Sequence, residues 1–178
     1  MGNLIADAML ARVKDQGIQI AIQNSGGIRA SLDAGEVTMG EVLAVLPFQN
    51  TLSTFEVTGQ VLIDALENGV SQAEEVKGRF PQVAGLKFSW DPTIAPGEGR
   101  ILDVLVQTRD GFAPIDPSAT YGVVSNNYVR GGGDGSKMFK TAANAYDYGP
   151  DLADVVAEYL AENSGNYSQY LDGRISSK

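Results

Sequence analysis

Residues 18–29, IQIAIQNSGGIR, join an alternating apolar run directly to a glycine-rich turn. Apolar and polar side chains alternate with period two over 18–23, which is typical of a β-strand. The glycines of 24–29 let backbone N–H groups converge and let a ligand approach closely. Arg29, at the end of the turn, can pair with a phosphate or carboxylate. The segment predicts a strand that ends in a binding loop, with an ordinary turn as the alternative.

A second glycine-rich segment has the same arrangement. Residues 121–125 predict a short strand, and residues 126–135, NNYVRGGGDG, follow it directly. Neither glycine-rich segment ends in the Gly-Lys-Ser/Thr of a P-loop, and neither has the glycine spacing of the dinucleotide fingerprint. Both therefore remain candidate binding loops without a known phosphate signature.

The elements around these two segments predict the fold class. Further strands are expected at 52–57, 83–90 and 101–108, and helices at 3–16, 38–45, 58–69, 136–144 and from Pro150 onward. Helices and strands are interspersed, and several strands lie beside each other in the sequence. This pattern favours an α+β fold, a single domain over 1–178 with a mixed β-sheet and packed helices, over a strictly alternating α/β fold.

Composition excludes several classes of function. The chain has 178 residues, 43% of them hydrophobic, which is enough for one domain with a full core. It contains no His and no Cys, so a Ser-His-Asp triad, a His-ligated zinc site and a thiol nucleophile are impossible within it. A net charge of −9 argues against a nucleic-acid surface. No apolar run reaches the length of a membrane span, and the N-terminus lacks the order of a signal peptide.

Several side chains in the loops could bind a ligand. Phe48 and Tyr128 lie beside Pro or Gly, and two facing rings would form a slot for a flat heterocycle; alone, each ring could instead fill the core. Asp134, between two glycines, could accept hydrogen bonds from a sugar diol or from its own turn. Asn24 and Asn50 could read a base edge or satisfy loop backbone. No acid–base pair emerges, so no catalytic residue is expected.

Five motifs in order resemble one known family. They are Gly2-Asn3-Leu4-Ile5-Ala6-Asp7-Ala8-Met9, Asn24-Ser25-Gly26-Gly27-Ile28-Arg29, Leu46-Pro47-Phe48, Asn127-Tyr128-Val129 with Gly132-Gly133-Asp134-Gly135, and Gly173-Arg174-Ile175. Over essentially the whole chain this series resembles the C-terminal domain of the 5′-nucleotidase/UDP-sugar hydrolase family. The resemblance implies the fold of that domain, and a separate N-terminal metallophosphoesterase domain that holds two divalent metal ions.

The resemblance implies that this domain binds the nucleotide and presents its phosphate to the two metals. The residues that it assigns to substrate binding are Asn24, Gly26, Gly27, Arg29, Phe48, Asn50, Tyr128, Gly132 and Asp134. In this assignment Phe48 and Tyr128 sandwich the base, Asp134 holds the ribose hydroxyls and Arg29 reaches the ribose–phosphate region. The expected partners are a nucleotide or nucleoside and the N-terminal domain of the same protein, with no cofactor in this chain.

Three departures from the family pattern bear on the pocket. Tyr128 stands where Phe is common, and its added hydroxyl needs a partner. Arg130 stands where a small residue is usual, so its charge either enters the pocket or points to solvent. One or more substrate Arg residues that are usual in the family would precede Met1.

The resemblance leaves alternatives open. The same domain occurs in 2′,3′-cyclic nucleotide phosphodiesterases and UDP-sugar diphosphatases, and a stand-alone, non-catalytic binding domain is a third reading. The full-length protein is expected to be a hydrolase in nucleotide catabolism, and this fragment alone is expected to be inactive. A periplasmic or extracellular location follows from the resemblance only.

Overall fold

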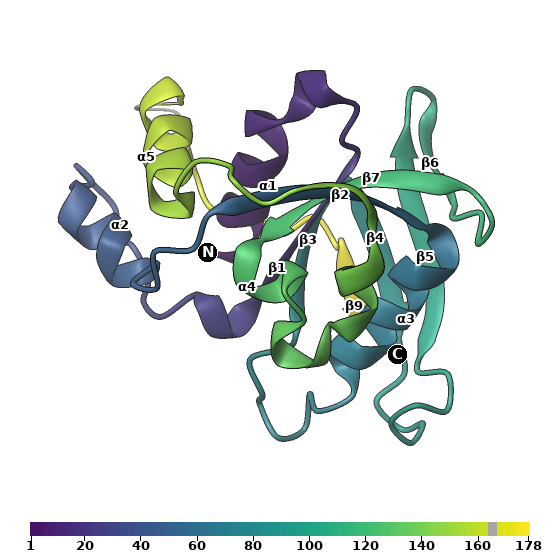
Figure 1. The fold of residues 1–178 in the computed structure, drawn as a ribbon. Helices are drawn as coiled ribbons and strands as arrows, with labels where there is room; N and C mark the ends of the chain where they lie inside the picture. Colours follow the sequence, from purple (N-terminus) through teal and green to yellow (C-terminus); the bar gives the residue numbers. More distant parts are fainter. Residues whose placement is uncertain (164–166) are drawn as a thin grey trace.

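The computed structural model describes residues 1–163 and 167–178, whose strands form two sheets with helices packed on them (Figure 1). The helices are α1 (Gly2–Arg12), α2 (Met39–Val45), α3 (Gly59–Val70), α4 (Asn127–Arg130) and α5 (Leu152–Glu162). The strands are β1 (Ile20–Asn24), β2 (Leu52–Thr58), β3 (Pro81–Ala84), β4 (Leu86–Trp90), β5 (Ile101–Thr108), β6 (Gly111–Pro114), β7 (Thr120–Asn126), β8 (Ala143–Tyr146) and β9 (Ile175–Ser177).

Both sheets contain parallel and antiparallel pairs. The larger sheet has the order β3-β1-β7-β2-β8, and the smaller has the order β6-β5-β4-β9. Strands β1 and β7 are parallel, and so are β4 and β9. The expected α+β class with mixed sheets is confirmed, although the strands are divided between two sheets rather than placed in one.

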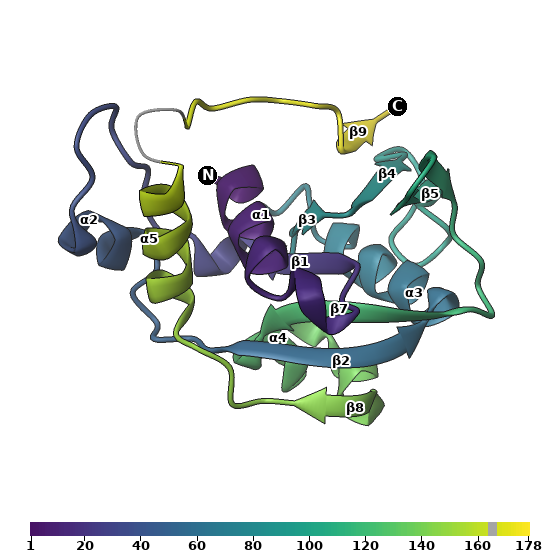
Figure 2. The ribbon, with the colours of Figure 1, turned by 90° about the horizontal axis from the view of Figure 1, so that it is seen from above.

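The period-two pattern of β1 sends its side chains into two hydrophobic cores. Ala21 packs in the core that contains α1, α2 and α5. Ile20 and Ile22 pack in the core formed with α3 and the smaller sheet. Figure 2 shows α2 and α5 together at one end of the molecule and α3 at the other. Because both faces of β1 are covered, every residue of the strand is buried, and a polar residue at its end needs an internal partner.

Side-chain caps start helices α2, α3 and α5. Thr38 and Glu41 form a capping box at the start of α2, as the spacing predicts. Thr58 accepts a hydrogen bond from the backbone N–H of Val61 at the start of α3. The last helix begins later than expected: Asp151 is its cap and Leu152 its first residue, so Pro150 lies outside it.

Two sequence predictions are wrong for reasons of tertiary structure. The predicted strand 83–90 is two strands, because Gly85 has a φ of 70° and turns the chain from the larger sheet into the smaller one. The predicted helix 136–144 forms only a short 3-10 helix at 137–141, after which β8 pairs with β2 at the sheet edge. Helix α4 and strands β6 and β9 are too short for a periodic signal and were not predicted.

The strand directions bring four loops to one edge of the larger sheet. Strand β1 runs parallel to β7, and both β2 and β3 run antiparallel to the neighbours they pair with. The carboxyl ends of β1 and β7 therefore lie beside the amino ends of β2 and β3. The loops at this edge are 25–29, 46–51, 77–80 and 127–135. We call this the loop edge; it holds both glycine-rich segments.

Candidate functional site

Three buried amide side chains meet where β1 and β7 end. Gln23 and Asn126 are fully buried, and Asn24 is 6% exposed. The Asn126 Nδ2 group donates hydrogen bonds to Gln23 Oε1 at 2.8 Å and to Asn24 Oδ1 at 2.9 Å. Its Oδ1 atom accepts a hydrogen bond from the backbone N–H of Val129 at 2.8 Å and so caps α4. Because each contact requires the same orientation of the Asn126 amide, the cluster has one arrangement.

The Asn24 side chain links the buried amide cluster to the carboxylate of Asp134. Its Oδ1 atom accepts hydrogen bonds from Asn126 and Gln23, so its Nδ2 group points outward. That group donates to Asp134 Oδ2 at 2.7 Å, a short, charge-assisted hydrogen bond. Asp134 has a φ of 51°, in the left-handed region that Asp tolerates better than most residues. The carboxylate is therefore fixed in position by buried groups.

Tyr128 contacts the other oxygen of the same carboxylate. Its hydroxyl donates to Asp134 Oδ1 at 3.2 Å and accepts a hydrogen bond from the Asp134 backbone N–H at 3.3 Å. The ring packs against Gly133, where an added Cβ would lie 2.5 Å from two of the ring carbons. The residue is 49% exposed. Asp134 is thus the partner that the Tyr128 hydroxyl requires.

Asn68, near the end of α3, forms a hydrogen bond with the turn that carries Asp134. Its Nδ2 group donates to the Asp134 carbonyl at 3.0 Å, and its Oδ1 atom accepts from Arg79 Nη1 at 3.3 Å. A Cβ at Gly135 would lie 2.6 Å from Asn68 Oδ1, and Gly135 has a φ of 83°. Glycine is required at this position by both the space and the backbone conformation.

The first glycine-rich loop is held against the segment 77–80. The backbone N–H of Gly26 donates to the Gly78 carbonyl at 2.8 Å, and a Cβ on either glycine would lie 2.8 Å from the Cα of the other. Arg29 Nη1 donates to the Gly26 carbonyl at 3.4 Å, and the Arg29 residue is exposed. The loop therefore presents a positive charge to solvent beside tightly packed backbone.

Phe48 and Asn50 lie beside this loop. Together with Gly27 they line a crevice that is too narrow for a water molecule and that Leu152 and Ala153 also border. Phe48 is 57% exposed and belongs to neither hydrophobic core. The alternative reading, in which this ring fills the core beneath its loop, is therefore wrong.

The loop that carries Phe48 is tied directly to the helix that carries Tyr128. The Thr51 backbone N–H donates to Asn127 Oδ1 at 3.2 Å, and the Asn127 backbone N–H donates to the Thr51 carbonyl at 2.9 Å. These contacts lie three residues after Phe48 and one residue before Tyr128. Both exposed rings therefore come from adjoining segments of the loop edge.

Arg130 turns away from the glycine-rich turn. Its guanidinium lies 5.7 Å from the centre of the Phe55 ring, and its Nε atom is 3.5 Å from Asp147 Oδ1. Its charge therefore faces Asp147 rather than Asp134. Gly132, two residues on, has a φ of 93°, and a Cβ there would lie 2.6 Å from Lys140 Cε.

The structure places all of the predicted site residues at the loop edge. Asn24, Tyr128 and Asp134 share hydrogen bonds; Gly26, Gly27, Arg29, Phe48 and Asn50 lie in the two adjoining loops; and Gly132 begins the turn that carries Asp134. Sequence reasoning missed Asn126, Asn68 and Gly78. A signal existed for Asn126, because an amide at the end of an apolar strand needs an internal partner. Asn68 and Gly78 reach the site only through tertiary packing.

The described residues do not fit a metal centre. Within 1–163 and 167–178, no three His, Cys, Asp or Glu side chains gather into a group that could hold an ion. The arrangement instead offers exposed rings, a fixed carboxylate and a guanidinium, which are groups that bind a ligand. In the same two ranges, no helix is both long and apolar enough to cross a membrane.

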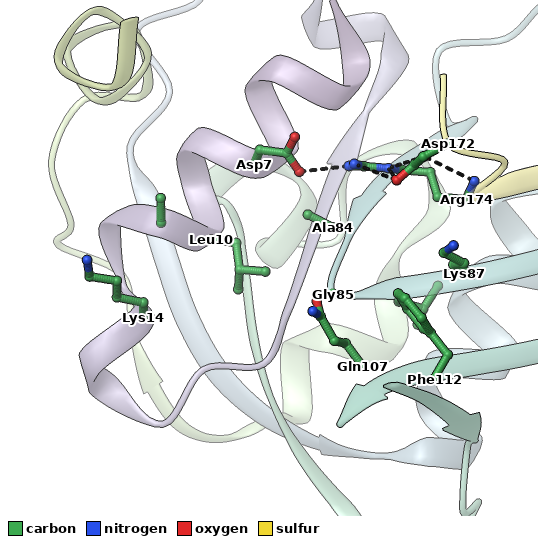
Figure 3. A pocket seen from close by; sticks show the side chains of 12 residues that line it. Asp7, Leu10, Lys14, Ala84, Gly85, Lys87, Gln107, Phe112, Asp172 and Arg174 are labelled. Atoms are coloured by element: carbon green, nitrogen blue, oxygen red, sulfur yellow. Dashed lines mark hydrogen bonds and ion pairs between the residues drawn. The ribbon is translucent and has the colours of Figure 1, made fainter. Parts of the chain in front are cut away.

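Two larger hollows lie away from the loop edge. A cleft of about 370 Å³ lies between α1, the turn from β3 to β4 and the hairpin of β5 and β6 (Figure 3). Beside it Arg174 Nη1 lies 2.8 Å from Asp7 Oδ1, and Arg174 Nε lies 3.0 Å from Asp172 Oδ1. The other hollow lies between residues 32–39 and α5. Neither is lined by a predicted site residue.

Comparisons with known proteins give the family of this chain. A family model described as "5'-nucleotidase, C-terminal domain" matches residues 1–141. The chain is 42% identical over 177 residues to the trifunctional nucleotide phosphoesterase protein YfkN of Bacillus subtilis, covering 98% of this chain and 12% of that protein. It is 33% identical over 188 residues to human 5'-nucleotidase, covering 98% of this chain and 33% of the relative.

Among solved structures, the 5'-nucleotidase precursor of Thermus thermophilus superposes with a TM-score of 0.95 at 44% identity, covering 99% of this chain and 34% of that one. The NAD nucleotidase of Haemophilus influenzae gives a TM-score of 0.87 at 27% identity, covering 99% of this chain and 33% of that one. The chain thus spans between 12% and 34% of the length of these relatives, which carry a larger additional part. It belongs to the family of 5′-nucleotidase C-terminal domains.

Proposed function

We propose that the chain is the nucleotide-binding domain of a 5′-nucleotidase-type phosphohydrolase, which presents the phosphate of the nucleotide to a dimetal site in an N-terminal domain. The observation that carries the proposal is the loop edge. There a carboxylate fixed by buried amides lies beside an exposed Tyr ring, in segments joined to a second exposed aromatic ring and an exposed Arg.

Each part of a nucleotide has a suitable group at the loop edge. Phe48 and Tyr128 offer exposed aromatic surface on which a base can stack. Asp134 is a carboxylate with acceptor capacity left for ribose hydroxyls, since Asn24 and Tyr128 occupy only part of it. Arg29 supplies a positive charge for the ribose–phosphate region. The roles of these residues are binding and orientation.

The bond-breaking groups are proposed to lie outside this chain. Its described residues fit no metal centre, and it contains neither His nor Cys. Two divalent metal ions in an N-terminal domain of the same protein would supply the nucleophile and charge stabilisation for phosphate release. The coverage of a third or less of the relatives' length leaves room for such a domain. A periplasmic or extracellular location is part of the same proposal.

The test separates binding from hydrolysis. In a titration of the isotope-labelled chain with AMP, the NMR signals of residues around Phe48, Tyr128 and Asp134 are expected to shift. Incubation of the same chain with AMP and Mg²⁺ or Mn²⁺ is expected to release no phosphate. Metal-dependent phosphate release by the pure chain, or a titration that leaves the loop edge unchanged, contradicts the proposal.

A broader set of substrates is the second candidate, favoured by one observation. The relative with 42% identity is described as a trifunctional nucleotide phosphoesterase protein, so a domain similar to this chain occurs in a protein with more than one phosphoesterase activity. Activity of the full-length protein on a panel of 5′-nucleotides, 2′,3′-cyclic nucleotides and UDP-sugars distinguishes the two candidates. A reading frame with no metal-binding motifs upstream of Met1 would instead favour a stand-alone binding domain.

A further inference from the structure

The two oxygens of the Asp134 carboxylate are held by partners of different strength. Asn24 Nδ2 is a largely buried donor at 2.7 Å from Oδ2. The Tyr128 hydroxyl is a half-exposed donor at 3.2 Å from Oδ1, well beyond the usual length of an O–H···O hydrogen bond. The Asn24 contact is fixed by the buried amide cluster, whereas the Tyr128 hydroxyl can be replaced on Oδ1 by a hydroxyl group of a ligand.

The position of the Tyr128 ring does not depend on its hydroxyl. The ring packs against the backbone of Gly133, where an added Cβ would lie 2.5 Å from ring carbons. Val129, the next residue, is 2% exposed and part of a hydrophobic core, and its backbone N–H is bound by Asn126. Loss of the hydroxyl therefore changes the hydrogen bonds of Asp134 while the ring stays in place.

We propose that the Tyr128 hydroxyl is an intramolecular substitute for a sugar hydroxyl and so weakens the selectivity of this site for ribose over a sugar that lacks both the 2′- and the 3′-hydroxyl. The inference rests on the proposed function, in which Asp134 faces the sugar of a nucleoside. A sugar hydroxyl that donates to Asp134 Oδ1 competes there with the Tyr128 hydroxyl, so its net gain is smaller than at an oxygen with no internal donor. A sugar without these hydroxyls leaves the Tyr128–Asp134 contact intact and loses little.

The test is the ratio of two dissociation constants, for 2′,3′-dideoxyadenosine and for adenosine, measured by NMR titration of the chain and of Tyr128→Phe. In Tyr128→Phe the carboxylate lacks its internal donor, so adenosine is expected to bind about three- to tenfold more tightly. Binding of 2′,3′-dideoxyadenosine is expected to stay within about twofold, because the ring face is retained. The ratio therefore rises about three- to tenfold.

Two further variants make the result specific. Tyr148→Phe removes a hydroxyl from a ring that is 86% exposed in another segment, and it is expected to leave the ratio unchanged. In an Asp134→Asn background, Tyr128→Phe is expected to change the ratio by less than about twofold, since the exchange requires the carboxylate. Amide spectra of each variant establish that the fold is retained.

The outcomes separate this inference from the proposed function. If both nucleosides bind at the loop edge but the ratio is unchanged or falls in Tyr128→Phe, the role of the hydroxyl is wrong and the proposed function stands. If neither nucleoside binds the unsubstituted chain, the proposed function fails and the inference fails with it.

Discussion

The side chain of Asn126 shows how one buried amide can organise an exposed site. It makes three hydrogen bonds, to Gln23, to Asn24 and to the first turn of α4. Through Asn24 it fixes Asp134, and through α4 it positions Tyr128. Asp134 and Tyr128 are therefore ordered before a ligand binds, which lowers the entropic cost of binding.

Substitution of Asn126 by Ala is expected to destabilise the fold. Removal of the amide leaves the Val129 N–H and Gln23 Oε1 without their partner in a buried place, which costs about 1–3 kcal/mol or more. The free energy of unfolding in urea measures the loss. Asn127→Ala is the matched control: that residue is exposed, water can replace its bond to Thr51, and a loss below about 1 kcal/mol is expected. Equal losses would show that burial of the cluster is unimportant.

Phe48→Ala is expected to weaken nucleoside binding and to leave the fold intact. The ring is 57% exposed, so its loss should change the free energy of unfolding by less than about 0.5 kcal/mol. Loss of stacking should weaken adenosine binding by about 1–3 kcal/mol. Titration and urea unfolding of the same sample separate the two effects. Phe112→Ala is the control: its ring, 41% exposed, lies on the smaller sheet, and the substitution should leave adenosine affinity unchanged. If Phe48→Ala also leaves the affinity unchanged, Phe48 does not bind the nucleoside.

Among the secondary-structure elements, the separation of β3 from β4 has the largest effect on the architecture. Gly85 alone lies between them, and it passes the chain from the larger sheet to the smaller. Its φ is 70°, and a Cβ there would lie 2.0 Å from the Gln19 carbonyl oxygen. The close approach of β3 to the segment before β1 therefore requires glycine. This turn lets the smaller sheet share a hydrophobic core with α3.

Gly85→Ala is expected to lower the free energy of unfolding by more than about 2 kcal/mol, because a steric clash adds to the left-handed backbone conformation. Gly17→Ala is the matched control. Gly17 has a similar φ of 75° and nothing within 4 Å of an added Cβ, so only the backbone cost of about 1 kcal/mol applies. Urea unfolding of both variants measures the difference. Equal destabilisation would mean that the backbone at Gly85 moves to accept the methyl group.

Residues 167–178 tie the molecule together, because they run across it to β9, which pairs with β4 (Figure 2). Arg174, 9% exposed, fastens the segment by hydrogen bonds to Asp7 of α1, to Asp172 and to the Val83 carbonyl. Tyr170 donates a hydrogen bond to Asp7 and accepts one from Arg174. The Gly173-Arg174-Ile175 motif is therefore structural in this fold, and it lies away from the loop edge.

This arrangement predicts a loss of stability in alkali. Burial, and a hydrogen bond to charged Asp7, raise the pKa of Tyr170 to about 12 from a reference of 10.0. Between these values the unfolded chain loses the Tyr170 proton while the folded chain keeps it, so the contribution of Tyr170 to stability falls as pH rises. Burial also raises the pKa of Tyr159 and of Tyr167. The free energy of unfolding is therefore expected to fall from about pH 10 upward.

Tyr170→Phe checks the assignment, because a phenylalanine has no proton to lose. Its free energy of unfolding, measured in urea at several pH values from about 9 to 12, should fall less steeply than that of the unsubstituted chain. Tyr148→Phe, at an 86% exposed ring, should leave the slope unaltered. An identical slope in Tyr170→Phe would assign the alkaline loss to other groups.

Local patterns predicted the elements that carry the site. The alternation of 18–23, the capping box at Thr38 and the two glycine-rich turns depend on residues close in sequence, so they can be read without a structure. The order of the motifs then gave the family, and with it the residues of the candidate site. These inferences needed only neighbours along the chain.

The sequence by itself determined the α+β class, the family and the residue types available to a ligand. Only the tertiary structure decided that Gly85 divides one apolar run between two sheets, that Tyr128 bonds Asp134, and that Arg130 turns toward Asp147. The pairing of β8 with β2 likewise replaced an expected helix. Tyr128 and Asp134 are close in sequence, but Asp134 is positioned by Asn24 from a distant strand. The other outcomes also depend on groups from separate parts of the chain, and the packing energy of such contacts outweighs the local preferences of any one segment.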